Sequence, residues 1–393
     1  MQNPEKTPFT RRSLILPIYL PAFLTAFGRG VIAPTLPIYI KSFNLSYALT
    51  TFVIAISVLG NVPAGILVER IGRKRSMVIG AIVVALSQMG IGFAHNLFEL
   101  IIYRLMEGIG GALWALSRHA YMTDVIPIPE RGRSIALFGG VNRIGTFGGP
   151  FAAIFLGKSL RLPFFISAVV VGLTSILCIF FVSETKRPTA SRHAPTHLGH
   201  FFTSLKTHYR SLATAGVGQI FVQTVRRGKG IIVPLYGSEV VGLDARGVRL
   251  IIMISSAVDM SMFPIAGYVM DRFGRKYATI PSFFIFAAGL VMMPYTRSFG
   301  WLLMTTIVMG LGNGLSSGAM MTLGADLAPK EGTGEFLGLW RLSGDFGGAT
   351  GPLVVGNIAD LWGLGISSFA LAGIGYATVL IFIFLVPETL RRE

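Results

Sequence analysis

The stretch Gly65-Ile-Leu-Val-Glu-Arg-Ile-Gly-Arg-Lys74 returns 202 positions later as Gly267-Tyr-Val-Met-Asp-Arg-Phe-Gly-Arg-Lys276. The same offset relates other glycines, prolines and acids of the two halves. Examples are Gly108, Asp124, Gly149 and Pro150, which correspond to Gly310, Asp326, Gly351 and Pro352. One offset kept over about 85 residues indicates an internal duplication, so the chain is built from two similar halves.

The composition places the chain in a membrane. Of its 393 residues, 52% are hydrophobic and only 13% are charged, and the mean hydropathy is +0.66. Soluble domains average about 25% charged residues, so a chain this apolar is an integral membrane protein. A single cysteine, Cys178, excludes both a disulfide framework and a cysteine-based zinc site.

The apolar runs predict twelve membrane-spanning helices. A helix needs about 20 mostly apolar residues to cross a bilayer. Six runs without charge meet this length: 42–68, 76–97, 162–183, 277–296, 299–325 and 363–387. Six equally long segments that carry ionisable residues lie between them: 14–40, 98–124, 134–157, 211–237, 248–270 and 335–359. We therefore expect an all-α membrane protein of two pseudo-symmetric six-helix bundles, residues 1–183 and 211–393, joined by a linker at 184–210.

The basic residues predict the orientation. The net charge is +16, and most of the Lys and Arg residues outside the spans fall in alternate loops together with both termini. Cytoplasmic loops carry such an excess, so we expect both termini and the linker in the cytoplasm. This explains the positive charge without nucleic acid. The first apolar run is too long for a signal peptide, and the short loops favour a bacterial inner membrane.

Three motifs resemble those of one transporter family. The doubled loop resembles the cytoplasmic signature loop of the major facilitator superfamily. Arg104-xx-Glu107-Gly108-x-Gly110 resembles a motif of its proton-driven exporters, and Gly145-xxx-Gly149-Pro150 resembles their antiporter motif, although the first helix lacks the acid that exporters often carry. The resemblance covers the whole chain and implies a secondary transporter that works by alternating access, with proton-coupled efflux as its direction.

The resemblance also implies that the doubled loop is a conformational latch. In the family the loop acid, here Glu69, lies at the N-terminus of helix 11, and Arg73 pairs with Asp124. A carboxylate at a helix N-terminus is stabilised by about 1 kcal/mol. The alternative is a loop that only sets the membrane topology. The latch residues are Gly65, Glu69, Arg70, Gly72, Arg73 and Asp124, with their repeats Gly267, Asp271, Arg272, Gly274, Arg275 and Asp326.

Small residues followed by proline occur at equivalent places in both halves. They are Gly145, Gly149 and Pro150, and Gly347, Gly351 and Pro352. Glycines spaced by four residues let helices approach closely, and proline frees a backbone carbonyl. These residues predict either helix pivots or static packing contacts.

Ionisable residues inside the predicted spans indicate a polar path. They are the cations Arg29, Arg104, Arg118, Arg143, Arg226, Arg227, Lys229 and Arg341, and the acids Glu107, Asp259 and Asp345. Each costs about 3 kcal/mol at the bilayer centre, so such residues usually face a cavity. The surplus of cations favours an anionic or amphipathic substrate, because guanidinium binds carboxylate and phosphate well. Internal pairing and snorkelling are the alternative.

Two sets of residues are candidates for transport chemistry. The substrate-binding candidates are Arg29, Arg104, Arg143, Gln219, Gln223, Arg226 and Arg341. The proton-coupling candidates are Glu107, Asp259 and Asp345, because a carboxylate that leaves an arginine for an apolar setting exchanges its proton readily. We expect a monomer whose partners are a small organic molecule, protons and the lipid bilayer, with no cofactor, no metal and no nucleic acid.

Other readings of the sequence remain open. The same fold also suits an organic-anion or lipid-type carrier acting as uniporter, symporter or flippase, or a sensor that binds ligand without transport. The pattern His119-xxxx-Asp124 is shared with acyltransferases and suggests a membrane enzyme, although its repeat lacks the histidine. Four histidines of the linker could hold zinc, but a solvated linker explains them. The chain has no GxxxxGK[ST] phosphate loop, so ATP does not drive it.

Overall fold

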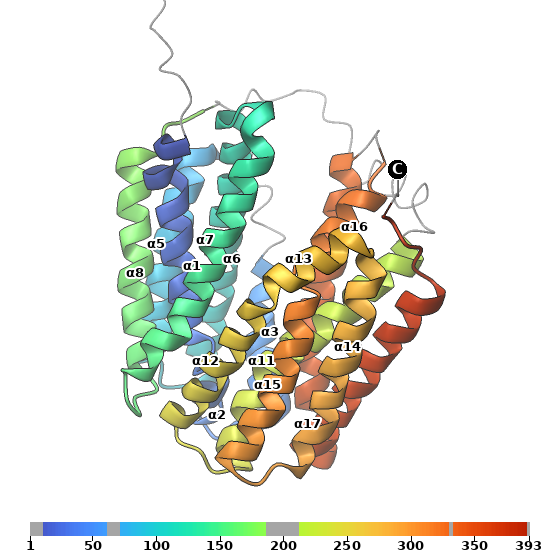
Figure 1. Cartoon of the computed structure of the whole chain (residues 1–393). Coiled ribbons are helices and arrows are strands. Elements are labelled where there is room, and N and C mark those ends of the chain that lie inside the picture. The colour runs from blue at the N-terminus through green and yellow to red at the C-terminus, as the bar shows by residue number, and fades with distance from the viewer. Residues whose placement is uncertain (1–10, 61–70, 186–211, 330–332, 391–393) are drawn as a thin grey trace, which may run out of the picture. The chain divides into compact units, whose positions relative to one another are not determined.

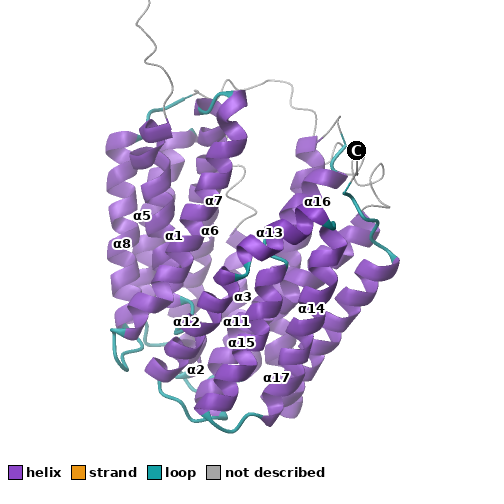
Figure 2. Ribbon diagram, viewed as in Figure 1, coloured by secondary structure: helices purple, strands orange, loops and turns teal. Residues whose placement is uncertain are grey.

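The computed structural model describes residues 11–60, 71–185, 212–329 and 333–390. Within these ranges the chain is helical and contains no strand (Figures 1 and 2). It divides into two compact units. Unit 1 comprises residues 1–33 and 56–190, and unit 2 comprises residues 34–55 and 191–393. Residues 34–55 thus lie in the first half of the sequence but pack within the unit that contains the second half.

The described part of unit 1 is built around five helices. They are α1 (Leu20–Ile32), α5 (Arg73–Phe93), α6 (Leu97–Val125), α7 (Ile128–Ile154) and α8 (Leu162–Phe181). The short turns η1 (Arg11–Leu14) and η2 (Ile15–Tyr19) precede α1, and η3 (Ile56–Gly60) packs on α6. Helix α5 packs against α6 and α8, and α1 packs against α7 and α8. The core of unit 1 includes the buried side chains of Met77, Trp114 and Cys178.

Unit 2 contains the remaining helices. They are α2 (Leu36–Lys41), α3 (Tyr47–Ala55), η4 (Leu212–Gly216), α11 (Val217–Glu239), α12 (Ala245–Ser261), α13 (Phe263–Arg272), α14 (Arg275–Met292), η5 (Met293–Tyr295), α15 (Phe299–Leu315), α16 (Ala319–Leu327) and α17 (Thr333–Phe384). Helix α17 is two helices in succession, because Gly363 breaks it with φ +86°. It packs along α11, α14 and α3, while α12 packs on α15.

The described residues contain eight helical segments that are long and apolar enough to cross a membrane. One of them, Phe336–Phe384, holds two helices around Gly363. Helices α7 and α11 are long but more polar, and the shorter apolar segment Tyr47–Gly60 leads into residues 61–70, which the structure does not describe. The eight segments, counted as nine because one holds two helices, together with α7, α11 and Tyr47–Gly60 give twelve candidate spans in the described part of the chain. The predicted all-α membrane fold is confirmed.

Side chains at the helix starts explain several boundaries. Asn96 Oδ1 accepts the backbone N–H of Glu99 at 3.0 Å where α6 begins, and Asp244 Oδ1 accepts that of Gly247 at 2.8 Å where α12 begins. Such caps bind N–H groups that have no partner within the helix. They fix the turns from which the long helices cross each unit.

Candidate functional site

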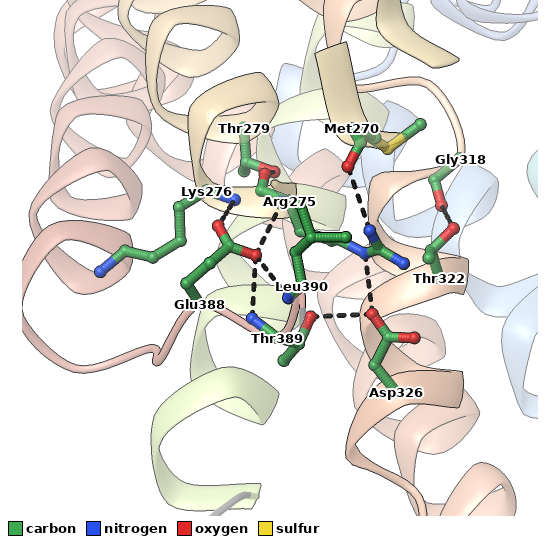
Figure 3. A network of polar contacts seen from close by, with 10 residues as sticks. All are labelled: Met270, Arg275, Lys276, Thr279, Gly318, Thr322, Asp326, Glu388, Thr389 and Leu390. Carbon is green, nitrogen blue, oxygen red and sulfur yellow. Dashed lines mark hydrogen bonds and ion pairs between the residues drawn. The ribbon is translucent and has the colours of Figure 1, made fainter. Parts of the chain in front are cut away.

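A polar network surrounds Arg275 at the start of α14 (Figure 3). The Arg275 Nε lies 2.8 Å from Asp326 Oδ2 on α16. Glu388 accepts hydrogen bonds from the backbone N–H of Arg275 at 3.0 Å and of Lys276 at 2.9 Å. Thr389 donates from its hydroxyl to Asp326 at 2.8 Å. Two carboxylates from separate parts of unit 2 therefore hold the first turn of α14.

The same network occurs in unit 1. Arg73 Nε lies 2.5 Å from Asp124 Oδ2 at the end of α6. Glu184 Oε1 accepts the backbone N–H of Arg73 at 2.8 Å and of Lys74 at 3.4 Å, and the Thr185 hydroxyl donates to Asp124 at 3.0 Å. The internal duplication thus preserves a four-residue arrangement, including the acid that caps the helix.

Glycine precedes the capped helix in both networks for a steric reason. Gly72 has φ +92° and Gly274 has φ +117°, values that side chains with a Cβ rarely adopt. A Cβ on Gly274 would lie 2.4 Å from Glu388 Cδ, and one on Gly72 would lie 3.2 Å from the carboxylate oxygens of Glu184. The loop motif therefore needs glycine where the carboxylate approaches the backbone.

The other predicted latch residues take no part in these two networks as described. Gly65, Glu69 and Arg70 lie outside the described residues, so the position of the Glu69 carboxylate stays a prediction. Their repeats Gly267, Asp271 and Arg272 lie on α13, where Asp271 and Arg272 are exposed. Arg272 Nη1 donates to the Tyr268 hydroxyl at 2.5 Å.

Sequence reasoning missed Glu184, Thr185, Glu388 and Thr389. A signal was present, since Val-x-Glu-Thr ends both halves of the chain. These copies are 204 positions apart, two more than the offset of the loop motif, so a search at one fixed offset passes over them.

In unit 1, two of the predicted membrane-embedded residues are bonded to each other. Arg104, which is buried, forms an ion pair with Glu107 one turn later on α6. Arg104 Nη2 also donates to the Ser57 hydroxyl at 2.9 Å, and Gln88 on α5 donates to Glu107 at 3.3 Å. Ser167 on α8 in turn donates to Gln88 at 2.8 Å. The pair is thus held by three other segments of the unit.

In unit 2, helices α11, α12 and α15 bring a second polar cluster together. Arg226 on α11 donates to the hydroxyl of Ser316, which follows α15, at 2.8 Å and to its carbonyl at 3.2 Å. Asn313 on α15 donates to Asp259 on α12 at 2.6 Å. Lys229, one turn after Arg226, donates to the Ser255 hydroxyl at 3.1 Å. We call Arg226, Lys229, Asp259, Asn313 and Ser316 the α11–α15 cluster.

Aromatic rings of α14 adjoin the two cations of the α11–α15 cluster. The Arg226 guanidinium lies 5.7 Å from the ring centre of Phe283, and the Lys229 ammonium lies 5.6 Å from that of Phe286. Both rings are fully buried. Cations at this distance from an aromatic face are attracted by its quadrupole, which offsets part of their desolvation.

Three members of the α11–α15 cluster were not among the predicted site residues: Lys229, Asn313 and Ser316. The duplication offers a signal for Asn313, because it occupies the position that Gly111 holds in the first half. Gly111 lies on the same face of its helix as Arg104 and Glu107. A polar residue at the repeat of that position points to the same interior location.

The remaining substrate and proton candidates lie elsewhere on the units. Arg29 on α1 and Arg143 on α7 are exposed in unit 1, and Arg341 on α17 is exposed in unit 2, four residues before the half-buried Asp345. Gln219 is buried and Gln223 half-buried, and both lie beside Gly344 where α11 meets α17.

The predicted pivot glycines lie at close helix crossings. A Cβ on Gly149 of α7 would lie 2.4 Å from the carbonyl carbon of Gly30 on α1. A Cβ on Gly347 of α17 would lie 2.2 Å from the Ile220 carbonyl oxygen on α11, and one on Gly351 would meet the Thr224 carbonyl at 2.4 Å. Gly145 packs in the same way on α1, and Pro150 and Pro352 lie within their helices. This close approach accounts for the glycines as packing residues, and pivoting stays a prediction.

The two residues of the acyltransferase-like pattern contact different groups. Asp124 is bonded to Arg73 and Thr185, whereas exposed His119 lies 3.3 Å from Arg118 Nη2. Within the described residues no group of three His, Cys, Asp or Glu side chains is arranged to hold a metal ion. The four linker histidines lie outside those residues.

Comparison with known proteins identifies the family. The sequence model described as Major Facilitator Superfamily matches residues 18–225 and 215–393. The multidrug resistance protein MdtG of Salmonella choleraesuis (strain SC-B67) is 25% identical over 377 residues, with 92% of each chain covered. Multidrug resistance protein 2 of Bacillus subtilis (strain 168) is 25% identical over 285 residues, covering 70% of this chain and 69% of that protein.

Solved structures share the fold. The nucleoside transporter NupG superposes with a TM-score of 0.77 at 12% identity, covering 95% of this chain and all of that one. A D-xylose-proton symporter superposes with a TM-score of 0.72 at 20% identity, covering 96% and 98% of the two chains.

Proposed function

Because the chain belongs to the major facilitator superfamily, we propose that it is a secondary transporter that exports an anionic or amphipathic organic molecule in exchange for protons. The observation that carries the proposal is the α11–α15 cluster, in which two cations and one carboxylate share the interior of unit 2. The relatives named as multidrug resistance proteins support export of organic molecules.

The cluster is suited to bind an anion. Arg226 donates to the Ser316 hydroxyl and carbonyl, and Lys229 donates to the Ser255 hydroxyl. A carboxylate or phosphate is a stronger partner for either cation than these neutral oxygens, so an arriving anion would compete for both cations. The buried rings of Phe283 and Phe286 add an apolar surface for the body of an amphipathic molecule.

Two carboxylates are suited to carry the proton. Asp259 is held by Asn313 near the cations, and Glu107 is held by Arg104 and Gln88. A carboxylate binds a proton when it is separated from its cation and releases the proton when the cation returns. Exchange then requires that the substrate and the proton occupy the site in alternate halves of the transport cycle. Asp345, with Arg341 four residues earlier, is the third proposed proton site.

The topology and the latch form part of the proposal. We place both termini in the cytoplasm of a bacterial inner membrane, with residues 1–183 and 211–393 as the two six-helix bundles, 184–210 as their linker, and the protein as a monomer. The Arg73 and Arg275 networks then lie at the cytoplasmic ends of the units. The Glu69 carboxylate is proposed to bind the N-terminus of the eleventh membrane-spanning helix, which is the first part of α17.

The test is a flux measurement in proteoliposomes under an imposed pH gradient. Lumenal pH is followed while cationic, neutral and anionic amphiphiles are added. Asp259→Asn and Glu107→Gln should abolish the proton movement that a substrate evokes, whereas Glu239→Gln, a change of an exposed acid at the end of α11, should retain it. Substrate-evoked proton flux that survives both neutralising variants would refute the assigned proton sites.

A second candidate is an anion carrier that moves no protons. It is favoured by the surplus of cations over acids among the intramembrane residues and by the missing acid in the first helix. In the same liposomes it predicts anion flux without a change of lumenal pH. Arg226→Ala should abolish that flux while Asp259→Asn leaves it intact.

A further inference from the structure

We propose that Asp360 is a releasable clasp that fastens residues 34–55 to unit 2 and must let go during transport. Both ends of this segment continue into unit 1, at residues 33 and 56, whereas its own packing lies within unit 2. Whatever holds the segment to unit 2 therefore determines which unit it moves with. The inference is independent of the substrate and of the coupling ion.

The clasp is a carboxylate on a helix N-terminus. Asp360, near the end of the first part of α17, accepts the backbone N–H of Tyr47 at 2.7 Å through Oδ1 and that of Ala48 at 2.9 Å through Oδ2. These are the first two residues of α3, whose N–H groups have no partner within the helix. The carboxylate also faces the positive end of the α3 dipole. Both oxygens are thus engaged with one short segment.

The close approach of α3 to Gly356, one turn before Asp360 on α17, supports the same assignment. A Cβ on Gly356 would lie 1.8 Å from Thr51 Oγ1 and 2.6 Å from the Tyr47 carbonyl oxygen. Gly356 and Asp360 are four residues apart and so share a face of α17. Glycine lets α3 approach closely enough for Asp360 to reach the helix start.

A second attachment lies at the other end of the segment. Arg249 on α12 is fully buried, and its Nε donates to the Thr35 hydroxyl at 3.1 Å. Lys41 lies close to the clasp, donates to the Leu45 carbonyl at 2.6 Å and lies 4.2 Å from the ring centre of Tyr47. The segment is thus tied to α12 and α17 by polar contacts as well as by packing.

The position of Asp360 makes the clasp distinct from the Arg275 network. The second part of α17 runs from the break at Gly363 to Phe384, and Glu388 follows it. Asp360 and Glu388 therefore lie at opposite ends of that helix. In the proposed topology Asp360 faces the extracytoplasmic side. Alternating access requires segments at that side to change partners, and because Asp360 is exposed, water can replace its carboxylate at the two N–H groups when the clasp opens.

Hydrogen–deuterium exchange of the full-length protein in liposomes tests the clasp directly. We expect Asp360→Asn to speed exchange of the peptide spanning residues 47–55 by about tenfold, since it removes the charge that binds the two N–H groups. Gly356→Val should have the same effect with Asp360 intact, because its side chain displaces α3. Glu239→Gln, which removes a nearby exposed acid at the end of α11, is the matched control for the loss of a negative charge.

Cysteine labelling provides the second readout. With Cys178 replaced by alanine, a Thr50→Cys reporter should react slowly with an impermeant maleimide, because Thr50 is fully buried. Asp360→Asn should raise its labelling rate. Unchanged exchange and labelling in Asp360→Asn would overturn the proposal, and so would an equal rise in Glu239→Gln. Substrate-evoked flux is measured separately, so failure of the clasp is distinguishable from failure of the proposed transport function.

Discussion

The carboxylate of Glu388 accepts a hydrogen bond from the backbone N–H of Lys276 and so caps a helix more than 100 positions earlier in the chain (Figure 3). Glu184 does the same for the helix that begins at Arg73. The last residues of each half thereby return to the signature loop of that half. This arrangement ties the end of each six-helix repeat to its centre, and it gives the loop glycines a structural purpose.

Glu388 should make stability depend on pH. Burial raises the pKa of its carboxyl group, but four backbone N–H groups, including those of Arg275 and Lys276, lower it more, and the net pKa lies below the usual value. A lowered pKa means that the stabilisation is complete above the pKa of the unfolded chain and is lost as the pH falls through the folded pKa. Glu388→Gln should therefore lower the Tm at pH 7 by about 1 to 2 °C and have little effect at strongly acidic pH.

Thermal unfolding in detergent across this pH range checks the prediction. Glu239→Gln serves as the control, because that acid is exposed at the end of α11. An identical Tm difference between wild type and Glu388→Gln at neutral and acidic pH would contradict the assignment.

Gly274→Ala should destabilise unit 2 more than the loss of the Glu388 charge. The φ of +117° is strained for alanine, and the new Cβ would overlap the Glu388 carboxyl group. A left-handed conformation alone costs about 1 to 2 kcal/mol. Gly267→Ala is the matched control, since a Cβ there meets nothing within 4 Å. The comparison of their unfolding midpoints measures the steric requirement, and equal midpoints would show that the loop relaxes around the side chain.

Arg73 and Asp124 should be energetically coupled. Arg73 Nε lies 2.5 Å from Asp124 Oδ2, and a partly exposed ion pair contributes up to about 1 kcal/mol. A double-mutant cycle of Arg73→Ala and Asp124→Ala, read by detergent unfolding, should give a coupling energy of that size. The same cycle at Arg275 and Asp326 should give a similar value. Strictly additive effects in both cycles would show that the ion pairs do not stabilise the units.

The sequence allowed the fold to be predicted because apolar length and the duplicated loop constrain it strongly. The family resemblance also implied the pairing of Arg73 with Asp124, whereas Arg104 was predicted to bind substrate and internal pairing was only the alternative. The placement of residues 34–55 in unit 2 could not be predicted from the sequence, because their apolar pattern fits any neighbouring helix. Asp360 was passed over for a related reason, since an acid in a turn between helices reads as a solvated loop residue. Its role depends on the N-terminus of α3, which lies more than 300 positions earlier in the chain.

Asn313 should be required for transport although it carries no charge. Its side chain donates to Asp259 at 2.6 Å and belongs to the α11–α15 cluster. Asn313→Leu leaves the half-buried Asp259 carboxylate without that donor, and a lost hydrogen bond to a charged group costs about 1.5 to 3 kcal/mol. We expect at least about a tenfold loss of substrate-evoked flux. Asn313→Gln, which keeps the amide, should restore part of the activity, whereas equal loss in both variants would indicate a purely steric role.

The crossing of α11 and α17 should not tolerate a larger side chain at Gly347. A Cβ there would lie 2.2 Å from the Ile220 carbonyl oxygen, and the Thr224 hydroxyl donates to the Gly347 carbonyl at 3.2 Å. Gly347→Val should separate the two helices, lower the unfolding midpoint and reduce flux, because Arg226 lies on the displaced helix. Gly373→Val is the control, since a Cβ on that residue, in the second part of α17, meets nothing within 4 Å. If Gly347→Val keeps the stability of the control but loses flux, the glycine serves movement rather than packing. Loss of both properties together would assign it to packing.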